Sequence, residues 1–509
     1  MADAESIAQL LERGSPGASA IGAPEGAPPL RYRDLAALAR HTVETLNGLG
    51  IGREDRVAIV LHNGPEAASA FVCIAAGATT APLNPGYRAE ELEFYLRDLG
   101  AKALVVDAGL ESPARAVAKM LSVPVLELRA DRARGAGTFT LVAREPARAP
   151  ARGGPAGPDD TALVLHTSGT TSRPKIVPLL QRNVLASARH IADTLSLGPG
   201  DACLNIMPLF HIHGLMAATL ASLAAGAQVS CTPGFNALKF FHWLDEVKPT
   251  WYTAVPTMHQ AILARAGHNG EIVARTRLRF IRSSSASLPP QVMAELEKTF
   301  RAPVIEAYGM TEAAHQMASN PLPPRPRKPG SVGLPAGPEI AVMDEQGNLL
   351  PPGEIGEVVI RGPNVTAGYD ASADANAKAF SDGWFRTGDQ GALDADGYLR
   401  LTGRLKELIN RGGEKISPLE VDGVLMGHPA VQQVVTFAMP HEKLGEDVAA
   451  AVVLRDGKVV TERELREFAE ARLAHFKVPR KIVVVHEIPK GATGKLQRIG
   501  LAAKLGLAP

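Results

Sequence analysis

The stretch HTSGTTSRPK, residues 166–175, decides how the rest of the chain is interpreted. Apart from His166 and Pro174, every residue in it carries a hydroxyl group or a positive charge or is a glycine, and an apolar run at residues 162–165 leads into it. Hydroxyl and backbone N–H groups can surround phosphate oxygens, while Lys175 balances their charge. The pattern predicts a strand that enters a phosphate-binding loop, although a solvated Ser/Thr turn is an equal alternative for the stretch alone. The G-x-x-x-x-G-K-[ST] spacing of the common P-loop is absent.

Length and composition narrow the class of protein. The 509 residues can bury a large core and should form more than one domain. The 54 Lys and Arg residues nearly balance the 53 Asp and Glu residues, so bulk charge favours neither nucleic acid nor a membrane as partner. The three cysteines lie far apart in the sequence, which fits a reducing compartment. With no signal-peptide pattern and no run of about 18 apolar residues, we expect a cytoplasmic protein.

Strands and helices alternate in the first part of the chain. The apolar patterns predict a strand, two helices and a second strand at residues 56–61, 65–76, 88–99 and 103–106. This order favours an α/β fold with a parallel sheet covered by helices. After a Pro-rich stretch at residues 320–330, short segments separated by Gly-Asn, Pro-Gly and Asp-Gly turns predict a β-rich subdomain.

The character of the chain changes again beyond about residue 404. We expect a helix over residues 418–426 and strands over residues 431–438 and 481–486. Thr461 and Glu464 form a capping-box pattern for a helix that runs to Leu473. About one hundred residues with their own α and β pattern can form a separate, small α+β domain.

Two further motifs carry groups suited to nucleotide chemistry. In EAYGMTE, residues 306–312, Tyr308 can stack on a base and Glu312 can hold Mg²⁺ bound to phosphates. In WFRTGD, residues 384–389, Asp389 can accept hydrogen bonds from ribose hydroxyl groups. Taken singly, the first motif is more often an ordinary strand exit and the second a β-turn.

Two motifs lie near or beyond the expected domain boundary. GRLKELINRGGEK, residues 403–415, combines charged residues with paired glycines, as a hinge facing a ligand would. PKGATGKLQR, residues 489–498, places Lys495 on a cationic loop that could enter a site and neutralise developing charge. A solvated linker and a solvated tail are the ordinary alternatives.

In this order and at these separations, the five motifs together resemble the adenylate-forming superfamily, which includes acyl-CoA synthetases, firefly luciferase and the adenylation domains of peptide synthetases. The resemblance covers essentially the whole chain. It implies a large N-terminal domain over residues 1–404 and a small, mobile C-terminal domain over residues 405–509, with a hinge near Lys406. It also implies the reaction: a carboxylate attacks the α-phosphate of ATP, pyrophosphate leaves, and a thiol such as CoA then displaces AMP.

The resemblance further implies roles for single residues. The β- and γ-phosphates would be held by Thr167, Ser168, Gly169, Thr170, Thr171 and Lys175. Tyr308 would cover adenine with Ala286 and Ser287 along the base, and Asp389 and Arg404 would hold the ribose. Contacts to the reacting groups would come from Thr311 at the α-phosphate, Glu312 at Mg²⁺ and Lys495 in the first half-reaction.

Two implied features concern the second half-reaction and the loop. After the C-terminal domain rotates, Gly412 and Gly413 would reach the tunnel for the thiol. In the phosphate-binding loop, Ser172 and Ile176 replace glycines that are usual in the superfamily. We expect Ile176 to stiffen the segment after Lys175 while leaving every phosphate-binding group in place.

The expected acyl pocket is polar. Its candidate segments contain His211, Ser285 and His315. The hydrogen-bond donors of these side chains would be costly to bury beside an apolar acid, but they would suit the second carboxylate of a short diacid. These segments resemble the oxalate–CoA ligase subfamily, in which matching residues hold the dicarboxylate. The alternatives are an aromatic-type gate at His211, a backbone-capping role for His315, and, least favoured, zinc bound by His211 and His213.

The sequence therefore predicts an ATP-dependent acid–thiol ligase that uses ATP, Mg²⁺ and CoA on oxalate. Malonate or another short acid is the main alternative substrate. A stand-alone adenylation enzyme that loads a carrier protein is less favoured, and a catalytically dead nucleotide-binding regulator is least favoured, because Lys175, Glu312 and Lys495 are all present.

Overall fold

The computed structural model describes residues 4–143, 149–167, 174–370, 373–491 and 494–507, and four β-sheets organise this part of the chain. One sheet has the strand order β7-β6-β5-β3-β4-β8-β9 and is parallel except at its two ends. Its strands are β3 (Arg56–Val60), β4 (Thr79–Pro82), β5 (Ala103–Asp107), β6 (Val125–Ala130), β7 (Phe139–Val142), β8 (Thr161–His166) and β9 (Ile176–Leu180).

The second sheet has nine strands in the order β16-β15-β14-β13-β12-β10-β11-β1-β2, and its centre, from β14 to β1, is parallel. Its strands are β1 (Ser19–Gly22), β2 (Leu30–Arg31), β10 (Ala202–Asn205), β11 (Gln228–Cys231), β12 (Trp251–Ala254), β13 (Phe280–Ser283), β14 (Val304–Met310), β15 (His315–Ser319) and β16 (Leu334–Pro335). The predicted parallel α/β fold is therefore confirmed.

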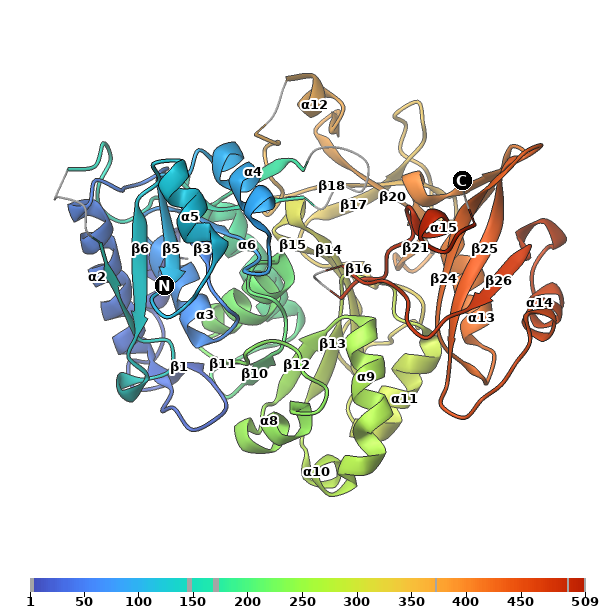
Figure 1. Cartoon of the computed structure of the whole chain (residues 1–509), viewed down its shortest axis with the longest axis horizontal. Helices are drawn as coiled ribbons and strands as arrows, with labels where there is room; N and C mark the ends of the chain where they lie inside the picture. The colour runs from blue at the N-terminus through green and yellow to red at the C-terminus, as the bar shows by residue number, and fades with distance from the viewer. Residues whose placement is uncertain (1–3, 144–148, 168–173, 371–372, 492–493, 508–509) are drawn as a thin grey trace.

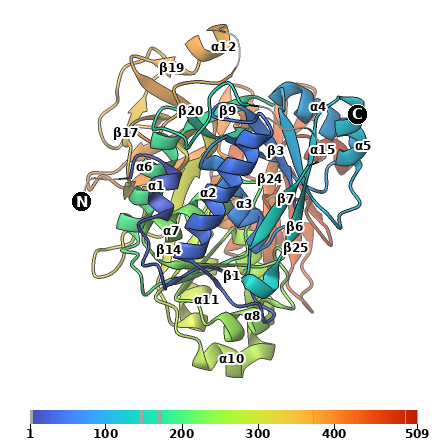
Figure 2. The same ribbon diagram turned by 90° about the vertical axis from the view of Figure 1, so that its left-hand side faces the viewer.

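Helices cover both faces of these sheets, as Figures 1 and 2 show. Side chains of β3 alternate: Val57 and Ile59 join the core between the two sheets, while Ala58 and Val60 join the core on the outer face. Because both faces are covered, the strand reads as one continuous apolar run. The helices are α2 (Tyr32–Gly48), α3 (Pro65–Ala75) and α6 (Gln181–Thr194) in the inner layer, α4 (Ala89–Leu99) and α5 (Pro113–Met120) on one outer face, and α8 (Phe240–Val247), α9 (Pro256–Ala266) and α11 (Pro290–Phe300) on the other.

The predicted β-rich subdomain follows the nine-stranded sheet. Its strands pair antiparallel and are β17 (Glu339–Met343), β18 (Gly356–Arg361), β19 (Phe380–Ser381), β20 (Trp384–Leu393) and β21 (Leu399–Arg404). Short antiparallel strands suit this tract because Gly and Asp turns separate them. The prediction for this region is confirmed.

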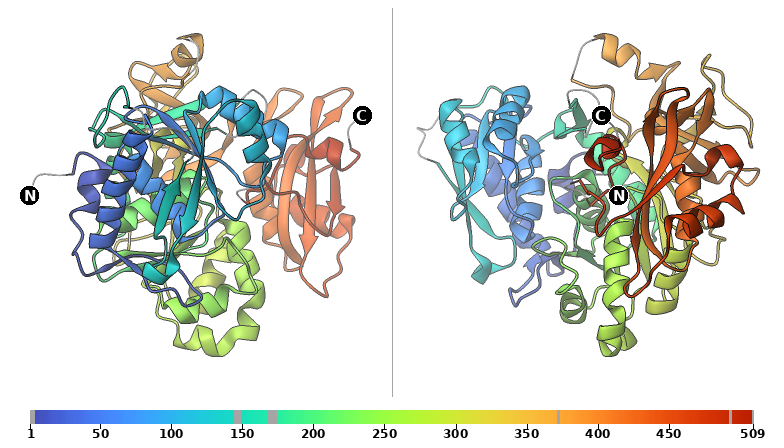
Figure 3. Two further views of the ribbon diagram at one scale, coloured as in Figure 1. Left: turned by 60° about the vertical axis from the view of Figure 1, so that its left-hand side comes forward. Right: turned by 45° about the vertical axis from the view of Figure 1, so that its right-hand side comes forward.

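The last part of the chain forms its own sheet, which lies at one end of the molecule in Figures 1 and 3. Its strands are β22 (Ile409–Arg411), β23 (Glu414–Ile416), β24 (Val431–His441), β25 (Gly445–Leu454) and β26 (Lys481–Val484), with helices α13 (Pro418–Met426), α14 (Glu462–Glu470) and α15 (Leu501–Lys504). The fold thus has the expected smaller C-terminal α+β part.

Three predicted boundaries in this part need correction. The strand expected over residues 431–438 runs on to His441, because its antiparallel pairing with β25 continues to Gly445. The capping box is present, since Thr461 and Glu464 bond reciprocally, but α14 ends at Glu470 and not at Leu473. Over the next residues, backbone hydrogen bonds to the fourth and to the third preceding residue alternate, and a 3₁₀ turn (His475–Lys477) follows. The regular α-helix therefore stops at Glu470. Likewise β26 ends at Val484, where its parallel pairing with β25 ends. Among the described residues, no helix is both long enough and apolar enough to cross a membrane.

Candidate functional site

Lys495 lies on the loop that the C-terminal part extends toward the large sheets. The hydroxyl group of Thr257, in the first turn of α9, donates to Gly494 O at 2.7 Å. On the other side, Arg498 Nη2 lies 2.5 Å from Asp422 Oδ2, within the C-terminal part. The loop is therefore held at both ends, with Lys495 between them.

The charge of Lys495 is set by its surroundings. Burial, together with the positive charge of Arg404, lowers the pKa of the Lys495 ammonium group to about 8, although Asp389 and Glu312 oppose this change. These groups come from β20, β21 and the turn after β14. The electrostatic coupling puts five predicted site residues, counting Lys495 itself and His211, in one neighbourhood.

Tyr308, Asp389 and Arg404 form one hydrogen-bonded group. Tyr308 Oη donates to Asp389 Oδ2 at 2.6 Å, and Arg404 Nε donates to Asp389 Oδ1 at 2.9 Å. The antiparallel register of β20 and β21 sets Asp389 directly opposite Arg404. Burial and the adjacent Asp389 carboxylate raise the pKa of the Tyr308 phenol well above its usual range.

Thr311 and Glu312 begin the 3₁₀ turn (Thr311–Ala313) that follows β14. Glu312 is 6% exposed, and its Oε1 accepts a hydrogen bond of 2.8 Å from Tyr369 Oη. Burial raises the pKa of the Glu312 carboxyl group, and within the described parts of the chain Glu312 has no ion-pair partner. A buried carboxylate without a partner cation has the donor chemistry that Mg²⁺ prefers.

The two described ends of the predicted phosphate-binding loop, Thr167 and Lys175, bond to each other. Thr167 N donates to Lys175 O at 2.9 Å, and Lys175 N donates to Thr167 Oγ1 at 3.2 Å. Lys175 Nζ lies 4.4 Å from the centroid of the Tyr369 ring. The predicted phosphate ligands Ser168, Gly169, Thr170 and Thr171, and also Ser172, lie outside the described residues.

Ile176 opens strand β9, opposite His166 of β8. Its side chain is 3% exposed and belongs to the core formed with α4 and α5. Lys175 is thus joined directly to a strand that is fixed in the sheet. The stiffening expected from Ile176 stays a prediction, and the burial of its side chain would be the physical reason.

His213 links two of the segments for which the sequence predicts an acid pocket. Its Nδ1 lies 3.0 Å from Ser285 Oγ, and its Nε2 lies 2.6 Å from Thr253 Oγ1 on β12. The residue is fully buried and begins a π-helix (His213–Leu220), an element that often occurs at functional sites. Sequence reasoning gave His213 no role beyond the zinc alternative, although its motif was part of the expected pocket.

His315 stacks on His213, with ring centroids 5.0 Å apart and an angle of 24° between the rings. It is 1% exposed, and neither ring nitrogen has a hydrogen-bond partner in the described structure. His315 and Ser285 both have left-handed backbone angles, with φ of 95° and 74°. Such conformations are costly for non-glycine residues and concentrate at functional sites.

The three histidines His211, His213 and His315 are uncharged at neutral pH. Burial lowers the pKa of His211 to about 3, and burial with nearby cations lowers the pKa values of His213 and His315 well below their usual range. Arg282 on β13 is one of these cations. This cluster therefore offers neutral imidazole groups within a positive field.

Arg282 lies in one of the segments for which the sequence predicts the pocket, but no role was predicted for it. It is fully buried, its Nη2 lies 3.4 Å from Gln316 Oε1, and its Nε and Nη1 have no partner among the residues described. Burial lowers the pKa of its guanidinium group to about 9. A charged residue within the otherwise apolar start of β13 was the available signal, because isolated buried charges are rare without a function.

Several predicted residues lie at the margin or away from this cluster. Ala286 and Ser287 are exposed directly after Ser285, and Lys406 is exposed in the 3₁₀ turn (Leu405–Glu407) after β21. Gly412 and Gly413 form the exposed turn between β22 and β23, with φ of 60° and 99°, and Gly412 N donates to Leu444 O. His211 lies near Lys495, whose charge contributes to lowering the His211 pKa.

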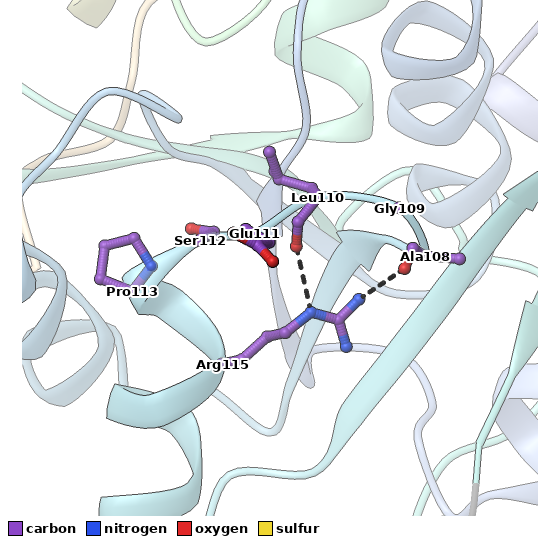
Figure 4. A pocket seen from close by; sticks show the side chains of 7 residues that line it. All are labelled: Ala108, Gly109, Leu110, Glu111, Ser112, Pro113 and Arg115. Carbon is purple, nitrogen blue, oxygen red and sulfur yellow. Dashed lines mark hydrogen bonds between the residues drawn. The ribbon is translucent and has the colours of Figure 1, made fainter.

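Two other features are separate from this cluster. Figure 4 shows a surface hollow formed by the loop after β5 and by Arg115, whose guanidinium group bonds to Leu110 O and to backbone oxygens of Asp107 and Ala108. None of the described site residues lines it. As for zinc, no three His, Cys, Asp or Glu side chains in the described ranges are grouped as metal ligands, and both ring nitrogens of His213 face hydroxyl groups.

Two family models match the chain, AMP-binding enzyme over residues 13–370 and AMP-binding enzyme C-terminal domain over residues 420–495. The chain therefore belongs to the AMP-binding enzyme family, whose ATP-dependent CoA ligases join a carboxylic acid to CoA through an acyl-adenylate.

Similar proteins narrow the comparison. The chain is 46% identical over 477 residues to oxalate–CoA ligase of Arabidopsis thaliana, covering 92% of this chain and 91% of that protein. It is 42% identical to oxalate–CoA ligase of Saccharomyces cerevisiae, covering 94% and 93%. Among solved structures, ATP-bound MatB from Rhodopseudomonas palustris superposes with a TM-score of 0.85 at 30% identity, covering 98% of each chain.

Proposed function

We propose that this enzyme activates oxalate with ATP and transfers the resulting oxalyl group to CoA, giving oxalyl-CoA, AMP and pyrophosphate. The observation that carries the proposal is the pair of stacked, buried histidines, His213 and His315, in the same electrostatic neighbourhood as Lys495. The identity with relatives named oxalate–CoA ligase supports the choice of acid.

The nucleotide would be held by the groups around Asp389. Tyr308 would cover adenine, with Ala286 and Ser287 along the edge of the base. Asp389 and Arg404, already joined at 2.9 Å, would receive the ribose hydroxyl groups. This arrangement needs little reorganisation, because the acceptor carboxylate is fixed from both sides before ATP arrives.

The phosphates would lie between the turn after β14 and the phosphate-binding loop. Thr311 would contact the α-phosphate, while Thr167, Lys175 and the loop between them would hold the β- and γ-phosphates. Glu312 would hold Mg²⁺, whose charge would offset that of the triphosphate.

In the first half-reaction, a carboxylate oxygen of the acid attacks the α-phosphorus of ATP, a P–O bond forms, and the bond to pyrophosphate breaks. Lys495 would lie between these two anions, where its ammonium group lowers their repulsion and stabilises the charge of the transition state. Although the pKa of the Lys495 ammonium group is lowered to about 8, it still lies above 7, so most of the group is protonated at pH 7.

The acid would be selected by the polar pocket. A second carboxylate could accept hydrogen bonds from His315 and Ser285, with His211 at the entrance, and would lie in the positive field of Arg282. An apolar acid would leave the buried ring nitrogens of His315 unpaired, at a cost of about 1–3 kcal/mol. The pocket thus favours a short, doubly charged acid.

The second half-reaction requires a different arrangement of the C-terminal part. Lys495 must withdraw before the CoA thiolate attacks the acyl carbonyl carbon and AMP leaves. We place the hinge at Lys406, between a large domain of residues 1–404 and a mobile domain of residues 405–509. Rotation would bring the turn at Gly412 and Gly413 to the thiol tunnel, and the cytoplasm would supply both co-substrates.

Pyrophosphate release tests the proposal. Purified protein with ATP, Mg²⁺ and CoA would be assayed across oxalate, malonate, acetate, octanoate and coumarate. A response dominated by oxalate, with oxalyl-CoA identified by mass spectrometry, is expected. Turnover of octanoate or coumarate without oxalate would refute the assignment of the histidine pocket, and release that depends on an added carrier protein instead of CoA would refute the thiol assignment.

A further inference from the structure

Tyr369 contacts both charged side chains that are proposed to hold the triphosphate and its metal ion. Its hydroxyl group donates to Glu312 Oε1 at 2.8 Å, and its ring centroid lies 4.4 Å from Lys175 Nζ. Glu312 follows β14 and Lys175 precedes β9, so one ring joins two segments that are far apart in the sequence. Tyr369 lies outside all five sequence motifs.

The backbone beside Tyr369 is fixed to the same two segments. Thr366 N donates to Glu312 O at 2.7 Å, which ties the chain to the turn after β14. Thr366 Oγ1 donates to Pro178 O at 2.8 Å, and Asp370 N donates to Ile176 O at 3.0 Å, which tie it to β9. The position of the Tyr369 ring is therefore set by hydrogen bonds on both sides.

The contact to Glu312 uses one carboxylate oxygen in a defined way. An ionised carboxylate only accepts hydrogen bonds and has about four lone-pair positions, so the phenol occupies one and leaves the others for a cation. Groups that hydrogen-bond a metal ligand orient it, and their loss typically weakens metal binding by about 10–100-fold. Tyr369 meets this description for Glu312.

The contact to Lys175 restrains the other charged group. An ammonium group over an aromatic face is attracted by the negative face of the ring. The ring thus holds the Lys175 ammonium group beside the base of the loop, where Thr167 and Lys175 close it.

We propose that Tyr369 is a positioning residue of the ATP site, which orients Glu312 toward Mg²⁺ through its hydroxyl group and holds Lys175 for the phosphates through its ring. The inference rests on the proposed function only in that the site binds ATP with Mg²⁺. It is independent of which acid the enzyme activates.

Two substitutions separate the two contacts. Tyr369→Phe keeps the ring over Lys175 and removes the hydrogen bond to Glu312, whereas Tyr369→Leu removes both. Tyr398 offers a matched control, because Lys328 Nζ lies 4.5 Å from its ring centroid and its hydroxyl group donates to Pro326 O at 2.6 Å. Tyr398→Phe and Tyr398→Leu therefore make the same chemical changes without touching Glu312.

The measurement is the affinity for ATP by titration calorimetry, first in EDTA and then at increasing Mg²⁺, with no acid or CoA present. For Tyr369→Phe we expect unchanged affinity for ATP in EDTA. The Mg²⁺ concentration that gives half of the maximal increase in ATP affinity should be roughly tenfold higher than in the wild type. For Tyr369→Leu we also expect roughly threefold weaker binding in EDTA. Both Tyr398 variants should match the wild type in both conditions.

An unchanged Mg²⁺ requirement in Tyr369→Phe overturns the inference, and so do equal shifts in the Tyr398 variants, which would indicate a general loss of structure. Tyr369→His, which keeps a ring and an N–H donor, should recover part of the Mg²⁺ affinity, and it remains informative if the Phe variant fails to fold. A shifted Mg²⁺ requirement in an enzyme that does not turn over oxalate would leave this inference standing and refute the proposed function.

Discussion

On the proposed nucleotide side of the site the polar groups already hold one another, whereas on the proposed acid side some of the buried polar groups are left without a partner. Asp389 accepts hydrogen bonds from Tyr308 and Arg404. By contrast, both ring nitrogens of His315 and two nitrogens of Arg282 are buried without a partner in the described part of the chain. The nucleotide side is thus organised for any reaction of the family, while the acid side carries a desolvation cost that only a polar acid relieves. Specificity should therefore depend on the unsatisfied side.

Lys495 is coupled to both sides, so its removal should have the largest effect. Lys495→Ala should lower the rate of adenylate formation by about 10²–10³-fold, because charge stabilisation at the α-phosphate is lost. Thioester formation from supplied oxalyl-AMP should stay near the wild-type rate. Single-turnover assays of the two half-reactions measure this, with Lys490→Ala, which removes a cation paired with Glu487, as control. Equal loss in both half-reactions would exclude the proposed role.

His315→Ala tests the acid side alone. We expect the KM for oxalate to rise roughly 10- to 100-fold while the KM for ATP changes little, because the variant removes a donor that the proposed function assigns to the acid. Steady-state kinetics with each substrate varied separately measure the two values. His428→Ala, which changes a histidine packed on Phe468 in the C-terminal part, is the control. A parallel rise in both KM values would mean that His315 supports the fold and does not bind the acid.

The turn at Gly413 belongs to neither the nucleotide side nor the acid side. A substitution there tests whether a third region, the proposed thiol tunnel, contributes to the reaction. Gly413→Leu should slow the thiol step roughly tenfold or more and leave adenylate formation intact. Gly457→Leu is a matched control, because at both glycines a Cβ atom would meet only open space, and their φ angles of 99° and 70° are both left-handed. The strain of about 1–2 kcal/mol is therefore shared. If both variants slow the thiol step equally, backbone strain and not the tunnel explains the effect.

The acid side also shows what sequence could and could not predict. The alternation of strands and helices, and the helices over residues 65–76 and 418–426, were predicted from local apolar patterns, which depend on neighbours along the chain. The roles of His213 and Arg282 depend on strands paired across the sheet, since Thr253 and Arg282 are register partners on β12 and β13. No local pattern specifies such pairing, and for the same reason Tyr369 was overlooked.

The pKa of Lys495 predicts how the reaction responds to pH. Since the group acts as a cation and its pKa is lowered to about 8, the protonated fraction is high at pH 7 and falls about tenfold per pH unit above 8. The kcat/KM for pyrophosphate release, which reports the free enzyme, should fall in the same way. In Lys495→Arg the rate should be lower but the fall above pH 8 absent, because guanidinium stays charged. An alkaline fall that persists in this variant would assign it to another group.

The smallest effect is expected where the C-terminal part meets the large one. Thr257 Oγ1 donates to Gly494 O at 2.7 Å, directly before Lys495, so it holds the loop in the position that we propose for adenylate formation. Thr257→Val keeps the shape of the side chain and removes the hydrogen bond, which should slow adenylate formation roughly three- to tenfold. Thr257→Ser should retain the wild-type rate. Because the contact must break before the thiol step, thioester formation from supplied oxalyl-AMP should not slow in Thr257→Val. Stopped-flow measurement of both half-reactions tests this prediction. An equal loss of rate in each would mean that Thr257 acts through the packing of α9 and not through its hydrogen bond to the Lys495 loop.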